Sequence, residues 1–152
     1  MPLDIRKITE KDLVLIYEWA NNPIVRSQSF NTELISLESH SEWFKRKLAD
    51  DNCYFYMILI DSKPMGQIRF GLLEGIAMIS YSISKEFRGQ GYGNEMLRVA
   101  INQFNGECPY YRNIHAKVKS ENNASKKIFT NLGFSLDKKY DDSGLLYILD
   151  NK

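Results

Sequence analysis

The chain has 152 residues, 43% of them hydrophobic and 26% charged, as expected for one soluble globular domain rather than a disordered or fibrous protein. Twenty basic residues nearly balance nineteen acidic ones, and the net charge of +1 gives no overall field that would attract nucleic acid or an anionic membrane. The start, MPLDIRKITEKDL, is charged where a signal peptide is apolar, and the apolar run YFYMILI is too short to span a bilayer, so we expect a cytoplasmic protein with no membrane partner.

The first third of the chain is expected to form one strand and two helices. Apolar and polar residues alternate in LDIRKI at residues 3–8, as in a half-buried strand. Thr9 and Asp12 are spaced like a capping box before an apolar helical stripe, which predicts a helix over residues 10–21 that the sequence NNP ends. A serine-capped second helix is predicted to end near Ala49.

The middle of the chain is expected to form an antiparallel meander and then a helix. Apolar runs at residues 53–60, 65–72 and 76–84 are separated by the short, turn-rich connections DSKP and LEG, which favour hairpins. A helical face follows a glycine-rich loop and is predicted to end at the Asn-Gly pair of residues 105–106.

The last third is expected to contain a strand at residues 113–119, a helix at 122–133 and two strands around the sequence DDSG. This element order predicts a single α/β domain over residues 1–152, with helices on both faces of a mostly antiparallel, mixed seven-stranded sheet and about four helices in all. Residues 145–149 are a candidate edge strand, so the sequence leaves a monomer and a homodimer open.

The sequence EFRGQGYGNEML at residues 86–97 places glycines at every second position just before a helix. The first turn of a helix has unpaired N–H groups and a partial positive charge, so such a loop can bind an anion through its backbone. A P-loop is excluded, because Asn94 and Glu95 follow where a lysine and a hydroxyl are needed. A dinucleotide fingerprint fits poorly, since its last glycine is missing and the preceding strands form hairpins. A plain tight turn is the remaining alternative.

Residues 88–93 match the pattern [RQ]-x-x-G-x-[GA], and VKSENNASKKIFTNLGF at residues 118–134 has an Asn-x-Ala pair before a helix that ends in Leu-Gly-Phe. In this order and at this separation, the two motifs resemble those of the GCN5-related N-acetyltransferases, the GNAT superfamily. The resemblance covers almost the whole chain and implies the acyl-CoA N-acyltransferase fold, with acetyl-CoA as the cofactor. In that fold the strands that end near Ser84 and Lys119 splay apart, and the thioester lies in the gap.

The resemblance also implies which residues hold the cofactor. The backbone amides of residues 88–93 would bind the pyrophosphate, the pantetheine would pair with residues 81–83, and Asn122 would hydrogen-bond the pantetheine arm. No metal ion is expected. The expected cofactor-binding residues are Tyr81, Ser82, Ile83, Arg88, Gly89, Gln90, Gly91, Tyr92, Gly93, Asn122, Ser125 and Phe129.

Two positions depart from the family pattern. Many members carry a tyrosine seven positions after the Asn, which protonates the departing thiolate, whereas this chain has Phe129. Some members carry a glutamate on the fourth strand, where this chain has Met78. The candidate catalytic acid is therefore Tyr81 or a tyrosine of KKYDDSGLLYIL, and the candidate base is His40, which titrates near neutral pH, or else water. The Ile83 N–H is expected to stabilise negative charge on the acetyl oxygen.

Residues 18–44 are expected to select the acceptor amine. Their W-x-N-x-P-x-V-R and S-x-x-S-H-x-x-W-F patterns resemble acetyltransferases that act on amino-sugar nucleotides in bacterial pseudaminic and legionaminic acid pathways. This implies a nucleotide-linked amino sugar, with Arg26 at its diphosphate and Phe30, His40 and Trp43 around the rest. A protein N-terminus is the alternative acceptor, because the ribosomal-protein branch of the superfamily has a similar groove. An acetyl-CoA-binding sensor without turnover is a further alternative.

Overall fold

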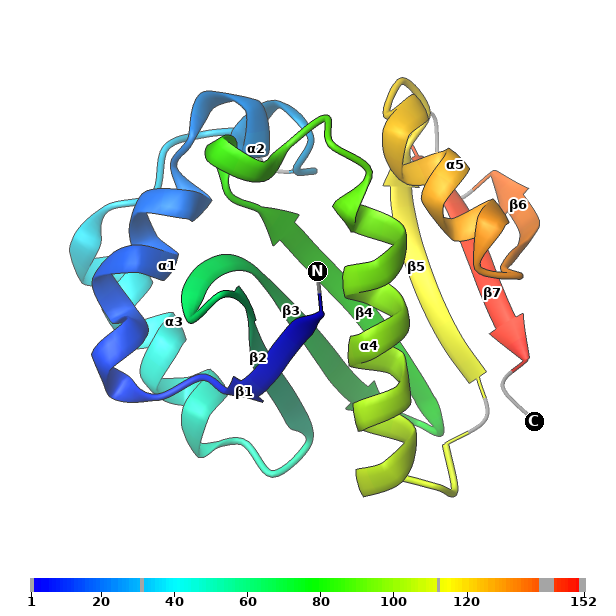
Figure 1. Ribbon diagram of the computed structural model, residues 1–152, viewed down its shortest axis with the longest axis horizontal. Helices are drawn as coiled ribbons and strands as arrows, with labels where there is room; N and C mark the ends of the chain where they lie inside the picture. The colour runs from blue at the N-terminus through cyan, green and yellow to red at the C-terminus, as the bar shows by residue number, and fades with distance from the viewer. Residues whose placement is uncertain (1, 31, 112, 140–143, 151–152) are drawn as a thin grey trace.

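The computed structural model describes residues 2–150 except 31, 112 and 140–143, and describes only the backbone of residues 138 and 139. Within these residues the chain forms one seven-stranded sheet in the order β1-β2-β3-β4-β5-β7-β6, flanked by five α-helices (Figure 1). Here β4 and β5 are parallel, and the other neighbouring strands are antiparallel. The predicted mixed, mostly antiparallel sheet is confirmed.

The helices and strands have the following bounds. The strands are β1 (Leu3–Lys7), β2 (Cys53–Ile60), β3 (Lys63–Leu73), β4 (Ile76–Ile83), β5 (Asn113–Lys119), β6 (Ser135–Lys139) and β7 (Gly144–Asp150). The α-helices are α1 (Leu13–Ala20), α2 (Pro23–Ser27), α3 (Leu37–Ala49), α4 (Tyr92–Glu107) and α5 (Asn123–Asn131), and the 3-10 turns are η1 (Glu10–Asp12) and η2 (Lys85–Phe87). None of the helices that the structure describes is both long enough and apolar enough to cross a membrane.

Helices cover both faces of the sheet, and alternate side chains of β2 enter two different cores. Tyr56 and Ile58 lie in the larger core beneath α4 and α5, whereas Phe55 and Met57 lie in the smaller core with α1 and α3. Because both of its faces are buried, β2 is apolar along most of its length instead of alternating with polar residues. The sheet therefore separates two helical layers.

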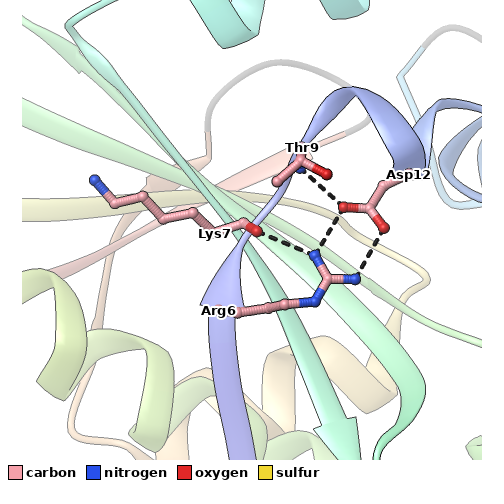
Figure 2. Close-up of polar contacts among 4 residues, drawn as sticks. All are labelled: Arg6, Lys7, Thr9 and Asp12. Atoms are coloured by element: carbon pink, nitrogen blue, oxygen red, sulfur yellow. Dashed lines mark hydrogen bonds and ion pairs between the residues drawn. The ribbon is translucent and has the colours of Figure 1, made fainter.

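An ion pair between Arg6 on β1 and Asp12 holds the turn η1 against the end of β1 (Figure 2). Arg6 Nη1 donates to Asp12 Oδ2 at 2.8 Å, Arg6 Nη2 donates to Oδ1 at 2.9 Å, and the Thr9 N–H donates to Oδ2 at 2.9 Å. The hydrogen bond from Arg6 is the main reason that the pKa of Asp12 is held below its usual range. The side chain of Asp12 thus takes the capping role predicted for it.

The helical boundaries differ from the prediction in two places. The segment predicted as one helix over residues 10–21 is a 3-10 turn followed by α1, and a separate short helix, α2, begins at Pro23. Proline has the φ angle that the first helical position needs, so it starts a helix here as well as ending the previous one. The helix α4 continues through the Asn-Gly pair of residues 105–106 to Glu107.

The prediction that residues 145–149 form an edge strand is wrong. The strand β7 pairs with β5 on one side and with β6 on the other, so its backbone groups are already used and cannot pair with a second copy. The unbroken apolar run LLYIL is typical of such an interior strand. Tyr140, one of the candidate acids, and most of the DDSG turn lie outside the described residues.

Candidate active site

A cavity opens where β4 and β5 diverge. The two strands pair from Ile76 with Asn113 as far as Ile79 with Ala116, and β4 then continues beside β3 while β5 continues beside β7. Figure 1 shows the ends of the two strands spreading apart. The cavity has a volume of about 1020 Å³ and lies between these strands, the glycine loop (residues 88–93), α5 and the segment from α1 to α3. The splayed pair of strands expected from the family resemblance is present.

The free edge of β4 presents backbone groups of Tyr81 and Ile83 to this gap. Ser84 donates its N–H to Met65 O on β3 at 2.8 Å, and in an antiparallel pair every second residue makes such bonds. Tyr81 and Ile83 fall between those positions, so their N–H and C=O groups point away from β3. Ile83 O accepts a hydrogen bond from Arg88 Nε at 2.8 Å, and the Ile83 N–H faces the gap.

The glycine loop leaves backbone N–H groups open at the N-terminus of α4. Gly89 and Gly91 have φ angles of 72° and 83°, and a Cβ on either would meet no atom within 4 Å. The described turn bond nearest the loop joins the Arg88 N–H to Lys85 O at 3.4 Å, just ahead of it. The positive φ angles, the open space and the partial positive charge of the helix start together form a cradle for an anion.

The third glycine, Gly93, has a different physical role. A Cβ at this position would overlap Ile128 Cδ1 on α5 and would lie 3.6 Å from Ile83 Cδ1 on β4. Gly93 therefore allows α4, α5 and β4 to approach one another closely beside the cavity.

Arg88 ties the glycine loop to β4 and to α2. Besides the bond to Ile83 O, its Nη1 donates to Asn22 Oδ1 at 3.2 Å, and Asn22 is the N-cap of α2. Arg88 Nη2 is buried without a described hydrogen-bond partner, and burial lowers the pKa of Arg88. A buried guanidinium N–H without a partner, next to open amides, suits a phosphate oxygen. These residues fit the diphosphate of the cofactor that the family resemblance implies.

Hydrogen bonds connect β4 to the start of α5 across the cavity. The Tyr81 hydroxyl lies 2.6 Å from Ser125 Oγ, and Asn122 Nδ2 donates to the same Oγ at 3.1 Å. Asn122 Oδ1 accepts the Ser125 N–H at 3.2 Å, which caps α5. Burial raises the pKa of Tyr81, so the phenol is protonated at neutral pH. Phe129 packs edge-to-face on the Tyr81 ring, with centroids 5.9 Å apart. The phenol that Phe129 lacks is therefore present on the neighbouring Tyr81 of β4.

Arg26 holds its own loop in shape at the cavity wall. Arg26 Nη1 donates to Glu33 O at 3.2 Å and Nη2 donates to Ser29 Oγ at 3.1 Å. Ser29 in turn donates to Val25 O at 2.7 Å. The Arg26 guanidinium, which was predicted to bind a diphosphate, thus already donates hydrogen bonds within its own loop.

The loop after α2 reaches across to the ends of β5 and β7. The ring of Phe30 lies so close to Gly144 that a Cβ there would be 2.6 Å from it, and Lys119 Nζ donates to Ser27 O at 3.0 Å. Phe30 remains 46% exposed, so a ligand can still reach its ring. This loop therefore covers one side of the gap.

His40 borders the cavity from within the smaller core and is 1% exposed. The rings of Tyr17, Trp43 and Phe44 surround it, with centroids 5.3, 5.7 and 5.8 Å away. His40 Nε2 lies 3.3 Å from Leu13 O, an arrangement that fits an N–H at Nε2. Burial lowers the pKa of His40, against a smaller opposite effect of the Leu13 hydrogen bond, and the imidazole is neutral at pH 7.

Two polar residues of β3, Gln67 and Arg69, line the cavity and were not predicted from the sequence. Gln67 Nε2 donates to Ser82 Oγ at 3.0 Å, while its Oε1 is buried without a described partner. The Arg69 guanidinium lies over the rings of Trp43 and Phe55, 4.9 and 5.7 Å from their centroids. The sequence does contain a signal for them. Both faces of this strand are expected to be covered by helices, so two alternating polar residues within it indicate a polar site.

The cavity brings together the predicted site residues with the exception of Gln90. Gln90 is outside its lining, and Gln90 Nε2 donates to Glu86 O at 2.9 Å. Among the described residues, no group of three or more His, Cys, Asp or Glu side chains is placed to hold a metal ion. The predicted residues that line the cavity are Arg26, Phe30, His40, Trp43, Tyr81, Ser82, Ile83, Arg88, Gly89, Gly91, Tyr92, Gly93, Asn122, Ser125 and Phe129.

Comparisons with known proteins agree with this geometry. A family model described as "Acetyltransferase (GNAT) domain" matches residues 3–135. Similar solved structures include a domain from Methanocaldococcus jannaschii, with 22% identity, 98% of each chain covered and a TM-score of 0.85. The spermidine N-acetyltransferase from Vibrio cholerae, in complex with CoA and spermine, has 20% identity over 99% of this chain and 96% of that chain, with a TM-score of 0.86.

A third similar structure is that of AAC(6')-Ib in complex with ribostamycin and coenzyme A. It has 18% identity over 100% of this chain and 94% of that chain, with a TM-score of 0.85. At these identities the three structures establish a shared fold. A search of curated protein sequences gives no significant match.

Proposed function

Because the chain belongs to the GNAT family of acetyltransferases, we propose that it transfers an acetyl group from acetyl-CoA to the amine of a nucleotide-linked amino sugar. The observation that carries the proposal is the open amide cradle of residues 89–93 beside the free edge of β4. An amine acceptor is supported by the similar structures that were solved with spermine and with ribostamycin. The finer choice of an amino-sugar nucleotide is supported by the sequence patterns of residues 18–44.

The chain contributes binding groups for the cofactor along the whole gap. Acetyl-CoA, when bound, supplies an acetyl group activated as a thioester. The amides of residues 89–93 and Arg88 Nη2 would hold its diphosphate, and the free backbone edge at Tyr81 and Ile83 would hold its pantetheine arm. The Ile83 N–H, which faces the gap, would be a hydrogen-bond donor for the carbonyl oxygen of the bound thioester.

Tyr81 is the proposed general acid. Its phenol is protonated at neutral pH and lies 2.6 Å from Ser125 Oγ, which Asn122 holds in place. Tyr81 therefore has a proton to donate toward the departing sulfur, with Ser125 orienting the hydroxyl. A thiol has a pKa near 8.5, so thiolate is already a good leaving group and this assistance is modest in size.

His40 is the proposed general base at the acceptor end. A base must be unprotonated to act, and burial keeps the imidazole in that state at neutral pH. Since His40 is only 1% exposed, a water molecule has to carry the proton from the amine to its ring. Phe30 and Trp43, which both line the cavity, supply aromatic surface for the acceptor.

Release of free CoA from acetyl-CoA tests the proposal when measured with a panel of amines. The panel contains a UDP-linked 4-amino sugar, a peptide with a free N-terminus, spermidine and an aminoglycoside. The proposal predicts turnover with the amino-sugar nucleotide above the other three. Turnover with the peptide alone would instead assign protein N-terminal acetylation, and tight acetyl-CoA binding without CoA release would assign a sensor.

A further inference from the structure

The walls of the cavity have one sign of charge. The charged residues among its described lining are all cations, namely Arg26, Arg69, Arg88, Lys117, Lys119 and Lys127. The described lining contains no Asp or Glu, although the chain as a whole is almost neutral. The positive charge is therefore concentrated at the site, and it exceeds what the diphosphate cradle alone explains, because Arg69 lies on β3 away from the glycine loop.

Arg69 is an enclosed cation without a counter-ion. Its side chain makes no hydrogen bond or ion pair with any described residue, its guanidinium contacts the Trp43 and Phe55 rings, and the nearby Cys53 thiol also interacts with its charge. Arg69 is half-buried and lines the cavity. Burial lowers the pKa of Arg69, yet a guanidinium remains charged in proteins. An enclosed charge is costly unless it is paired, and an anionic ligand group would pair it.

Gln67 places a second group on the same side of β3. Its buried Oε1 lacks a described partner, and the residue opposite it on β4 is Ser82, next to Ile83. Gln67 and Arg69 are two residues apart on one face, so their Cα atoms are separated by roughly 7 Å. Gln67 thus offers a hydrogen-bond acceptor near the proposed point of transfer, and Arg69 offers a cation farther along the strand.

We propose that the acceptor carries a phosphate or carboxylate that Arg69 binds through its forked guanidinium, while Gln67 Oε1 accepts a hydrogen bond from the acceptor amine. This inference rests on the proposed function and narrows it. It assigns the anion of the acceptor to Arg69 in place of Arg26, whose donors hold the loop. A polycation such as spermine or an aminoglycoside meets only like charges on the described walls and is disfavoured.

Binding of a small anion tests the inference without acetyl transfer. The protein is first saturated with CoA, so that the cofactor fills its own phosphate sites, and is then titrated calorimetrically with inorganic pyrophosphate and, separately, with succinate. Saturable binding of either anion that weakens at least about tenfold in Arg69→Met supports the inference. Arg69→Lys keeps the charge but not the fork, and we expect an intermediate affinity. Equal affinities in Arg69→Met and wild type, or no binding of either anion to wild type, would overturn it.

The matched control is Arg98→Met. Arg98 is exposed on α4 and outside the cavity lining, so its substitution removes the same charge without touching the site. Anion affinity is expected to stay within about twofold of wild type. A loss equal to that of Arg69→Met would attribute binding to overall charge and reject the assignment. Thermal unfolding of both variants verifies that each is folded.

Matched amines then identify the source of the negative charge. Glucosamine 6-phosphate against glucosamine tests phosphate, and 4-aminobutyrate against its amide tests carboxylate. The inference predicts that the anionic member of at least one pair has the higher kcat/KM, and that Arg69→Met removes the difference. A higher kcat/KM for the neutral members or for spermine would contradict it. Anion binding without CoA release from any amine would retain the Arg69 site and reject the transferase proposal. Acetyl transfer without anion binding would retain the transferase proposal and reject the Arg69 site.

Discussion

The packing of Gly93 against Ile128 gives a prediction whose size follows from the structure. Alanine at position 93 would place its Cβ on Ile128 Cδ1 and 3.3 Å from Ile128 Cγ1. Overpacking of this kind costs about 1–3 kcal/mol, and the better helix propensity of alanine returns up to about 1 kcal/mol. We therefore expect Gly93→Ala to lower the free energy of unfolding by up to about 2 kcal/mol.

A second substitution isolates that contact. Ile128→Val deletes Cδ1 and alone costs about 0.5–1.5 kcal/mol. In the double variant the overlap is gone, apart from the tight approach of Cγ1, so we expect a favourable coupling energy of about 1 kcal/mol between the two substitutions.

Urea unfolding of the four proteins measures this coupling. Gly106→Ala is the control, because Gly106 is also in α4 but a Cβ there meets no atom within 4 Å, and alanine should stabilise the helix by about 0.5–1 kcal/mol. If the effects of Gly93→Ala and Ile128→Val simply add, the close approach of α4 and α5 is not the reason for a glycine at position 93.

Three further substitutions test the capping ion pair and the two proposed catalytic groups. Asp12→Asn should cost about 1–2 kcal/mol at neutral pH. Because the pKa of Asp12 is lower in the folded protein, its contribution to stability is present above the unfolded pKa and is lost as the pH falls through the folded pKa. Urea unfolding should therefore show a smaller difference in the free energy of unfolding between variant and wild type at pH 3 than at pH 7. Tyr81→Phe should lower kcat about tenfold to a hundredfold with unchanged acetyl-CoA affinity, and an unchanged kcat would remove Tyr81 as the acid. His40→Phe should lower turnover at saturating acetyl-CoA and flatten the loss of stability below pH 6.5, where the unfolded imidazole gains a proton that the folded one resists. Turnover equal to wild type would assign deprotonation to water.

The cofactor side of the site could be predicted from sequence because its chemistry is local. Positive φ angles at Gly89 and Gly91 are required by a turn that immediately precedes a helix. Both the turn and the start of the helix can be recognised from residues 86–97 alone. Asn122 caps the helix that contains its own motif. Neither feature depends on which distant segment packs beside it.

The rest of the site depends on contacts between distant segments, and the sequence showed less of it. The bond between Tyr81 and Ser125 joins residues that are 44 positions apart, and the one between Arg88 and Asn22 spans 66 positions. Arg69 looks like an ordinary polar residue of a strand until the cavity is known to open on its face of the sheet. The interior place of β7 likewise became clear only from its pairing with β5 and β6.

The central claim is that main-chain amides of residues 89–93 bind the diphosphate of coenzyme A. A crystal structure of the CoA complex tests it most directly, by the distances from these nitrogen atoms to the diphosphate oxygens. We predict several N–H···O distances near 2.9 Å, with Arg88 Nη2 on the same diphosphate. A diphosphate bound elsewhere, or loop amides hydrogen-bonded to the chain's own carbonyls in that complex, would contradict the account.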